Sequence, residues 1–234
     1  MLTIRHGAER GHANHGWLDS NFTFSFSEYY DPDHMGFRAL RVINEDYVEA
    51  GRGFGRHPHK DMEILTYVLE GTVRHQDSTG GGGDLVPGEL QHMSAGKGIM
   101  HSEINPSRTE PLHLLQVWLV PNKLGIPPAY EQKPFSVNQE PNKLHLLASK
   151  DARNESFKIV SDAEVLAAKI EPGHSVEHAF SGKHGWLQVA RGGVIANGVA
   201  LEQGDGLAIS NEATLKIESG NGSEGGEVLL FDLD

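Results

Sequence analysis

The stretch from Gly51 to Glu63 reads GRGFGRHPHKDME and carries two histidines, His57 and His59, that are separated by one residue. In a β-strand, side chains two residues apart project from the same face, so these two imidazoles would point the same way. Imidazole is the commonest metal ligand among protein side chains. The stretch therefore predicts a strand that offers two neighbouring nitrogen ligands to one point.

A second stretch, from Gly96 to Asn105, reads GKGIMHSEIN and repeats this spacing, with His101 and Glu103 two residues apart. We expect the two strands to lie on facing walls of a barrel and to bring three imidazoles and one carboxylate to a single ion. The predicted ligands are His57, His59, His101 and Glu103. Such a set, without sulfur, suits one divalent Fe, Mn, Co, Ni, Cu or Zn ion and leaves positions open for catalysis or ligand capture.

Short apolar segments separated by turn residues dominate the rest of the chain. Examples are Ala39–Ile43, Ile64–Leu69, Leu112–Val120, Leu144–Ala148 and Val228–Leu233. Their length and their content of Val, Ile, Leu and aromatic residues are typical of strands. Asn197 and Gly198 stand between two such segments and predict a tight hairpin. The expected fold class is all-β, a barrel or a sandwich.

One segment predicts a helix instead. Ser161–Ala168 begins with a possible N-cap, Ser161, and places Glu164 three residues later, which is the spacing of a capping box. We therefore expect one short helix here in an otherwise all-β chain.

The two halves of the chain carry a weak internal repeat. Gly51 and Gly71 stand 20 residues apart, and Gly173 and Gly193 are separated by the same 20 residues. The recurrence predicts two similar β-barrels in tandem. The alternative is that glycine-ended turns recur in any β protein.

We place an N-terminal, metal-binding barrel at residues 1–133 and a C-terminal barrel without metal at residues 134–234. The connection between them is expected over Glu131–Gln139, which includes Pro134. A strand exchanged between the barrels would blur this limit.

The second copy of the repeat lacks the predicted ligands. Aligning the two copies through their glycines sends the four ligand positions to residues that do not bind metals well. The aligned positions are Ala179, Ser181, Ile217 and Ser219. We therefore expect the C-terminal barrel to serve as a packing partner without a metal site.

Composition argues against several classes of protein. Lys and Arg number 20 against 32 Asp and Glu, and the net charge of −12 excludes a basic nucleic-acid surface as the default. The absence of cysteine excludes disulfides, thiolate zinc sites and iron–sulfur clusters. No apolar run suits a transmembrane helix or a secretory signal. We expect a cytoplasmic protein with no direct nucleic-acid or membrane partner.

Several segments of the sequence, including the two that carry the predicted ligands, resemble those of a known family. The run from Gly51 to Gly71 is similar to the first motif of the cupin superfamily, and the run from Gly88 to Asn105 is similar to the second. The segments GWLDS at 16–20, YYDP at 29–32 and LRVIN at 40–44 further resemble the pirin family, strongly in the first half of the chain and loosely in the rest. The resemblance implies a bicupin: two jelly-roll β-barrels packed face to face, with metal in the N-terminal one.

The resemblance also bears on the ligands. The metal ligands of pirins fall on His57, His59, His101 and Glu103, and all of them are present. In many other cupins a glutamate at the position of Glu63 binds the metal. The pirin pattern implies that Glu63 instead lies behind the ligands and orients one of their imidazoles.

The resemblance is strongest to bacterial pirin-like proteins regarded as quercetin 2,3-dioxygenases. It implies a metal-dependent dioxygenase that cleaves a flavonol such as quercetin with dioxygen. Fe(II) is the expected ion, and Glu103 is expected to bind it and to accept the proton of the flavonol hydroxyl as general base. We expect a monomer, because one chain already contains two barrels.

Two other functions stay open. The same ligands would serve a metal-dependent redox-sensing or regulatory protein that acts through protein contacts, a role in which relatives of pirin have been implicated. A metal-assisted isomerase or hydrolase acting on a small acid is also compatible, since cupin sites host many reactions.

Overall fold

A computed structural model describes residues 1–220 and 225–234 of the chain. These residues are mostly β-strand, with two short 3₁₀ segments, η1 (Gly7–Glu9) and η2 (Arg153–Glu155). The all-β prediction is therefore confirmed. None of the helical segments in the described part of the chain is long and apolar enough to cross a membrane.

The described residues form two compact units. The N-terminal unit comprises Gly11–Pro134 and Ile159–Ser161. The C-terminal unit comprises Met1–Arg10, Phe135–Lys158 and Asp162–Asp234. The first ten residues thus belong to the C-terminal unit. As limits of independently folding domains, 1–133 and 134–234 stay a prediction, as does the face-to-face packing of the two barrels.

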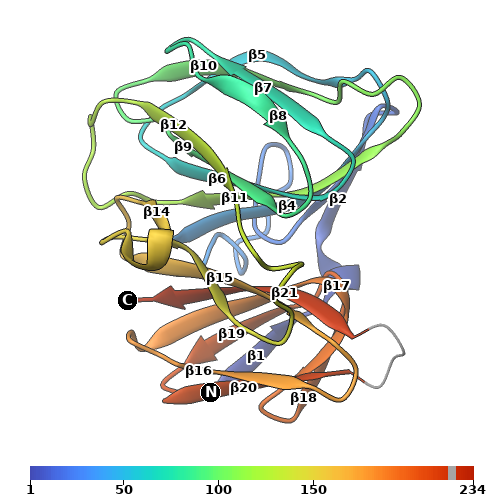
Figure 1. Ribbon diagram of the computed structural model, residues 1–234, viewed down its shortest axis with the longest axis vertical. Helices are drawn as coiled ribbons and strands as arrows, with labels where there is room; N and C mark the ends of the chain where they lie inside the picture. The colour runs from blue at the N-terminus through green and yellow to red at the C-terminus, as the bar shows by residue number, and fades with distance from the viewer. Residues whose placement is uncertain (221–224) are drawn as a thin grey trace. The chain divides into compact units, whose positions relative to one another are not determined.

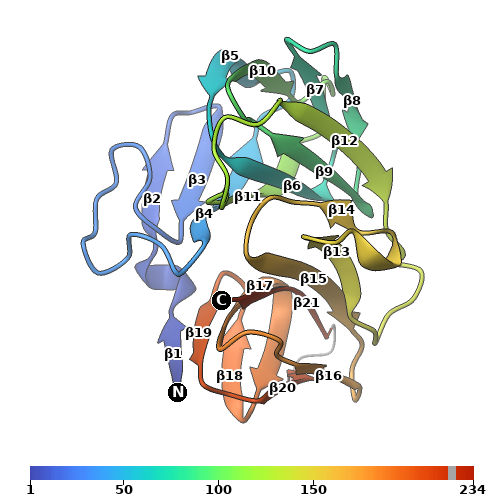
Figure 2. The ribbon, with the colours of Figure 1, turned by 90° about the vertical axis from the view of Figure 1, so that its left-hand side faces the viewer.

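The N-terminal unit contains two antiparallel sheets, which Figure 1 shows as two layers. The four-stranded sheet has the order β5 (Gly53–His59), β10 (Ile99–Ile104), β7 (Val73–Asp77) and β8 (Gly82–Leu85). The seven-stranded sheet has the order β12 (Ala129–Pro134), β9 (Glu89–Ser94), β6 (Glu63–Glu70), β11 (Leu112–Leu119), β4 (Leu40–Val48), β3 (Leu18–Phe22) and β2 (Gly11–Asn14). Figure 2 shows β2 and β3 continuing this sheet beyond β4.

Strand β12 overlaps the segment in which we expected a connection. Residues 131–134 pair with β9, from Glu131 opposite His92 to Pro134 opposite Glu89. The chain leaves the N-terminal unit only after Pro134. A proline at the end of an edge strand is tolerated, because its missing N–H is not needed for pairing there.

A glycine at the end of β6 lets the chain change sheets. Gly71 has φ +78°, and a side chain there would place its Cβ 2.5 Å from the carbonyl oxygen of Pro111. Glycine is the residue that adopts this conformation without steric cost. The chain therefore turns from β6 in the seven-stranded sheet to β7 in the four-stranded sheet, and polar side chains of both strands enter the space between the sheets.

Apolar side chains fill much of that space. One cluster contains Leu18, Val48, Val68, Val73, Leu85, Leu112 and Leu114. Another contains Ile64, Met93, Ala95 and Ile99. Full burial of each of the larger side chains contributes about 1.5–3 kcal/mol to folding, so these clusters hold the two sheets together around the polar site described below.

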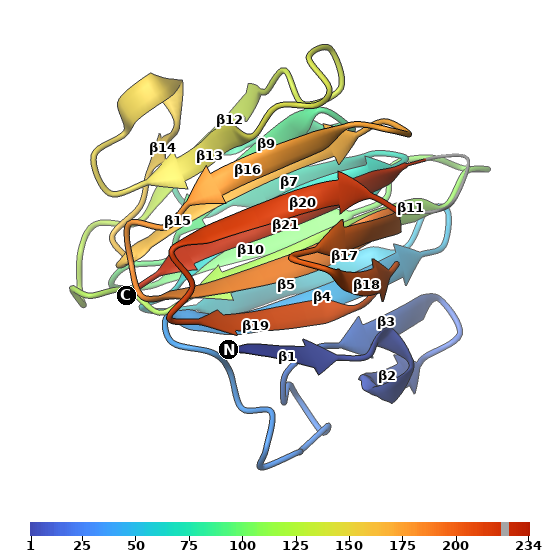
Figure 3. The same ribbon diagram turned by 90° about the horizontal axis from the view of Figure 1, so that it is seen from below.

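The C-terminal unit is built on a ten-stranded sheet. Its strands are β1 (Leu2–Arg5), β13 (His145–Ser149), β14 (Phe157–Lys158), β15 (Ala163–Ile170), β16 (Ser175–Ala179), β17 (His184–Ala196), β18 (Val199–Glu202), β19 (Gly206–Ser210), β20 (Thr214–Ser219) and β21 (Gly226–Leu233). Figure 3 shows β1 lying along β19, with which it pairs from Leu2 opposite Ile209 to Arg5 opposite Gly206.

The predicted hairpin at Asn197 and Gly198 is confirmed. Ala196 of β17 pairs with Val199 of β18. Both turn residues have positive φ, +44° and +83°, as a tight two-residue hairpin turn requires.

The predicted helix over Ser161–Ala168 is wrong. This segment enters strand β15, which pairs with β21 along its whole length from Ala163 to Ile170. The Ser161 hydroxyl donates to the carbonyl of Val120 at 2.9 Å instead of capping a helix. Burial of most of β15 between two neighbouring strands outweighs the weak local helix signal.

The predicted internal repeat is visible in the order of the strands. From β4 to β11 the N-terminal unit follows the same succession as β15 to β21 in the C-terminal unit. The long strand β17 takes the place of both β6 and β7, and Gly192 within it, with φ +63°, takes the place of Gly71.

Candidate metal centre

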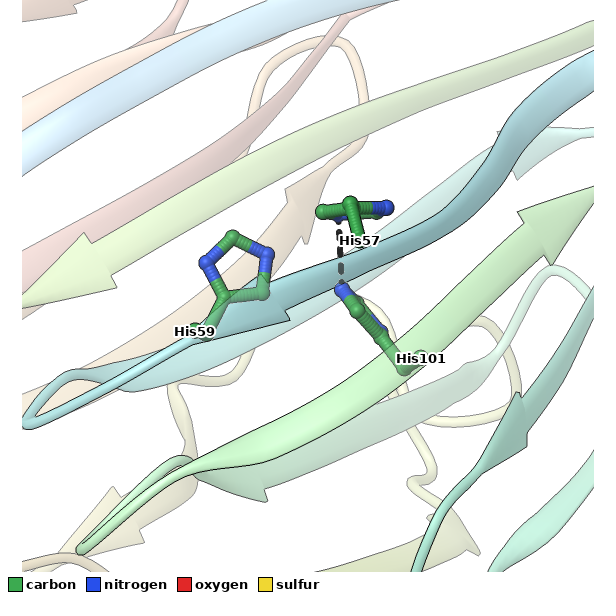
Figure 4. A group of neighbouring side chains, drawn as sticks. All are labelled: His57, His59 and His101. Carbon is green, nitrogen blue, oxygen red and sulfur yellow. Dashed lines mark hydrogen bonds between the residues drawn. The ribbon is translucent and has the colours of Figure 1, made fainter.

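The three predicted histidine ligands come together in the N-terminal unit. His57 and His59 lie on β5, and His101 lies on β10 directly opposite His57 (Figure 4). One ligand nitrogen from each ring lies within 4.8 Å of the others. The expectation that the two strands occupy facing walls is wrong, because β5 and β10 are hydrogen-bonded neighbours in the same sheet.

The protonation of His57 follows from its backbone contact. Its Nδ1 lies 2.7 Å from the carbonyl oxygen of Gly55, which can only accept a hydrogen bond. Nδ1 therefore carries the proton, and in a neutral ring the opposite nitrogen, Nε2, presents a lone pair. Metal-binding histidines characteristically have their second ring nitrogen held in this way.

The protonation of His101 follows in the same way from two further residues. Its Nδ1 lies 3.3 Å from Nδ1 of His75, and Nε2 of His75 lies 3.3 Å from Oδ2 of Asp77. The carboxylate accepts, so a neutral His75 ring donates from Nε2 and accepts at Nδ1. His101 then donates from Nδ1, and its Nε2 presents a lone pair.

Two lone pairs consequently face each other. Nε2 of His57 and Nε2 of His101 are 3.0 Å apart (Figure 4). A cation between them would relieve their repulsion. Two imidazole nitrogens bound at right angles, at about 2.1 Å from one ion, would also lie about 3.0 Å apart. The donor set therefore fits a divalent metal ion.

The pKa values of two of the histidines suit this role. Burial lowers the pKa of His59 to about 4, and neighbouring His101 and His57 lower it further in the same direction. Burial, with His57 and His75 adding to it, lowers the pKa of His101 to about 3. Both rings are therefore neutral at pH 7, as a metal ligand must be.

Glu103, the predicted carboxylate ligand, is buried on β10 two residues beyond His101. It belongs to a second group of possible ligands, in which its carboxylate lies within 4.8 Å of His75 and His101. The two groups share His101. The structure therefore places Glu103 beside the histidine cluster, on the side of His75.

Three polar side chains of the seven-stranded sheet hold the carboxylate of Glu103. Gln91 donates to Oε1 at 3.0 Å, and Gln116 donates to Oε2 at 2.8 Å. The hydroxyl of Thr66 lies 3.2 Å from Oε1 and 2.8 Å from the amide oxygen of Gln116. Charge-assisted bonds of this kind fix the position of a buried carboxylate.

We expected Glu63 to orient a ligand imidazole, but the structure shows that it contacts other residues. Its carboxylate accepts hydrogen bonds from His92 Nε2 and from the Ser94 hydroxyl, each at 2.6 Å. Burial alone would raise the pKa of Glu63, but these contacts hold it below its usual value. Glu63 therefore stabilises the join between β6 and β9 rather than the metal centre.

A cavity of about 270 Å³ opens beside the histidines and is lined by His57, His59 and Glu103. Its apolar wall includes Phe22, Phe26 and Trp118. The rings of Phe26 and Trp118 meet edge to face at 5.4 Å, and Trp118 meets His59 in the same manner at 4.8 Å. The volume is near the lower end for sites that bind small organic molecules.

The floor of the cavity is polar. Ser20 on β3 and Asn44 and Asp46 on β4 line it. Asn44 is 4% exposed, and its Oδ1 accepts no hydrogen bond from any described residue. Burial raises the pKa of Asp46 to about 7, although the Ser20 hydroxyl donates a hydrogen bond to it. These groups can meet polar substituents of a ligand.

Sequence reasoning missed several residues of the site. His75 and Asp77 stand two residues apart, as do Asn44 and Asp46, and each pair sits on one face of a strand. This spacing is the same signal that identified His57 and His59, but nothing local showed that β7 and β4 border the same space.

Comparison with known proteins identifies the family of the chain. Residues 4–119 match the family described as Pirin, and residues 146–233 match the family described as Quercetinase C-terminal cupin domain. Quercetin 2,3-dioxygenase of Escherichia coli is 54% identical over 234 residues, covering 100% of this chain and 99% of that protein. A pirin-like protein of Caulobacter vibrioides is 40% identical over 224 residues, covering 95% of each.

Solved structures agree. The crystal structure of YhhW from Escherichia coli superposes with a TM-score of 0.94 at 52% identity, covering 100% of this chain and 98% of that one. The bacterial pirin YhhW in complex with nickel(II) gives 0.92 at 52% identity, covering 100% and 99%. A divalent metal is therefore indicated for the site. With two cupin-type domains and relatives along its full length, the chain belongs to the pirin family.

Proposed function

We propose that this protein is a metal-dependent dioxygenase that cleaves a flavonol such as quercetin with dioxygen. His57, His59, His101 and Glu103 would hold one divalent ion, Fe(II) in the cell. The observation that carries the proposal is that Nε2 of His57 and Nε2 of His101 face each other at 3.0 Å, beside a cavity with aromatic walls. The name of the E. coli relative, quercetin 2,3-dioxygenase, supports the choice of substrate.

The walls of the cavity suit a flat aromatic substrate. Phe22, Phe26 and Trp118 offer apolar surface to the rings of a flavonol and exclude water from the reacting end. At the floor, Asn44 offers an unpartnered acceptor to a second hydroxyl of the substrate. A hydroxylated ring compound would satisfy that oxygen, whereas a hydrocarbon would leave it buried and unpaired.

When bound, the ion would favour the anionic form of a hydroxyl group and bring it close to dioxygen. The residues of the chain supply the proton transfer. A carboxylate oxygen of Glu103 accepts the proton of the flavonol hydroxyl, while Gln91 and Gln116 keep the carboxylate in place by donating to both of its oxygens. His57 and His59 line the same cavity and orient the reacting end.

The proposal is tested by following quercetin absorbance with protein loaded with Fe(II). We expect oxygen-dependent loss of absorbance with release of carbon monoxide, and we expect chelator treatment or His59→Ala to abolish both. His178→Ala, in the C-terminal unit, is the matched control and should retain the activity. Robust turnover by metal-free protein would overturn the proposal. Stable metal binding without turnover would also overturn it and would favour a regulatory binding protein.

A further inference from the structure

We propose that His75 and Asp77 are positioning residues of the metal centre, which fix His101 in the tautomer that leaves its Nε2 free for the ion. Neither residue belongs to the ligand set proposed above. The inference rests on that proposed metal centre, but it does not depend on whether a flavonol is the substrate.

The arrangement begins at Asp77, which the surrounding hairpin holds firmly. Its Oδ1 accepts hydrogen bonds from the backbone N–H of Thr79 at 2.7 Å, from the Thr79 hydroxyl at 2.7 Å and from the N–H of Gly81 at 3.0 Å. Its side chain is buried. The second oxygen, Oδ2, is therefore held in place toward Nε2 of His75 at 3.3 Å.

His75 is equally constrained. It is 0% exposed, and its ring stacks on Tyr130 with the centroids 4.4 Å apart and the planes 18° from parallel. In the register of β7 against β10, His75 lies opposite Glu103 and Asp77 lies opposite His101. The stacking and the strand pairing together aim the His75 ring at Nδ1 of His101.

The chemical consequence is a fixed direction for every hydrogen bond in the row. Asp77 accepts from His75 Nε2, so in a neutral His75 ring Nδ1 accepts from His101 Nδ1. Without His75, the proton of His101 could move to Nε2, where it would point at Nε2 of His57 and occupy the place of the ion. The carboxylate also increases the electron donation of the imidazole to the metal.

The same atoms allow an opposing interpretation, in which His75 is itself a ligand. His75, His101 and Glu103 lie within 4.8 Å of one another, as the ligands of one ion would. The two interpretations differ in the state of His75. As a positioning residue it keeps a protonated Nε2 and an Nδ1 bonded to His101, whereas as a ligand it would bind the ion directly.

The test measures metal binding without any substrate. Dissociation constants for Ni(II) are obtained by chelator competition for the parent, Asp77→Asn and His75→Phe, of which the last keeps an aromatic ring against Tyr130. We expect both variants to bind Ni(II) about 10–100-fold more weakly, as losses behind a ligand imidazole do. Asp84→Asn is the matched control, because Asp84 lies on the same hairpin and pairs with exposed Arg74; its constant should stay within about twofold of the parent.

A second readout reports the proton itself. Long-range ¹H–¹⁵N NMR of histidine side chains, on metal-free and Zn(II)-loaded protein, identifies the protonated nitrogen of each ring. We expect Nδ1–H for His101 in the parent and a mixture of tautomers in metal-free Asp77→Asn. An altered fold alone would change the thermal unfolding of the metal-free protein without this change in tautomer.

Three results would overturn the inference. They are an Nε2–H tautomer of His101 in the parent protein, direct coordination of His75 in the Zn(II)-loaded spectrum, or unchanged Ni(II) affinity in Asp77→Asn. If His75→Phe does not fold, the parent spectrum and Asp77→Asn still decide. Loss of quercetin turnover would bear on the proposed function but not on this arrangement, since neither measurement uses the substrate.

Discussion

The N-terminal and C-terminal units follow the same order of strands but use the corresponding positions differently. In the N-terminal unit, the paired strands β5 and β10 place His57 opposite His101 and Phe54 opposite Glu103. In the C-terminal unit, β16 and β20 take their place, and Val176 lies opposite Ile217 where the N-terminal unit has Phe54 opposite Glu103. Val176 and Ile217 both belong to the hydrophobic core of their unit.

The register of β16 against β20 refines the alignment made from the glycines. That alignment assigned Ala179 to the position of His57, whereas Ala179 pairs with Thr214 near the end of the strand. Ile217 pairs with Val176 and Ala196, as Glu103 pairs with Phe54 and His75, so Ile217 takes the position of Glu103 and not that of His101, to which the alignment had assigned it. The same scaffold thus carries a buried carboxylate in one unit and a packed isoleucine in the other, and the chemistry depends on a few substituted positions.

His101→Ala is expected to have the largest effect, and the property affected is metal binding. Removing a ligand should weaken Ni(II) binding by more than about 100-fold, the upper end of the range for partners behind a ligand. Chelator competition measures this loss. His178→Ala is the control from the other unit, where His178 donates to Asp232 at 3.0 Å. Equal losses of Ni(II) affinity in His101→Ala and His178→Ala would contradict the expectation that the metal site lies in the N-terminal unit.

Ile217→Ala should show the opposite pattern. Ile217 is 0% exposed, and truncating it removes contacts and leaves a cavity, which costs about 2–5 kcal/mol of unfolding free energy. Urea unfolding of metal-free protein measures the cost. The affinity for Ni(II) should be unchanged. A drop in that affinity would contradict the expectation that His101 serves metal binding and Ile217 serves stability.

Asp46→Asn should have a smaller effect that depends on pH. The folded chain keeps a proton on Asp46 up to about pH 7, whereas the unfolded chain loses it near its ordinary pKa of 3.8. Between these values the folded state binds more protons, so stability falls as the pH rises. We therefore expect Asp46→Asn to be more stable than the parent at pH 8, by on the order of 1–3 kcal/mol, and equal to it below pH 4.

Thermal or urea unfolding of metal-free protein across this pH range checks the expectation. Asp205→Asn in the C-terminal unit is a useful comparison, because Asp205 accepts hydrogen bonds from the backbone N–H of Gly7 and of Glu202. Its replacement should destabilise the protein at pH 8. A gain in stability for both variants would mean that Asp46 is not distinguished by its burial in the cavity floor.

The histidine cluster could be predicted from sequence because it depends on local spacing. His57 and His59 share a face of any strand they occupy, and the same holds for His101 and Glu103. The pairing of the two strands could not be predicted, because spacing alone does not say which strands are neighbours. We therefore expected facing walls, whereas β5 and β10 are adjacent in one sheet.

Other parts of the site and of the fold depend on partners far away in the chain. Asp77 and His75 belong to the site only because β7 pairs with β10, and Asn44 belongs to it only because it lines the cavity. Similarly, the capping pattern at Ser161 gave no sign that β21 would pair with the segment that follows. Pairing with distant strands overrides weak local preferences, and this is where the sequence prediction was wrong.

The pairing of β1 with β19 has a consequence for synthesis of the chain. Leu2–Arg5 is synthesised well before its partner, which begins only at Gly206. At typical rates of translation, β1 waits on the order of 10–40 s for that partner. Gly11–Pro134 is synthesised during this interval, so β1 pairs only after the residues of the N-terminal unit that follow it have been made.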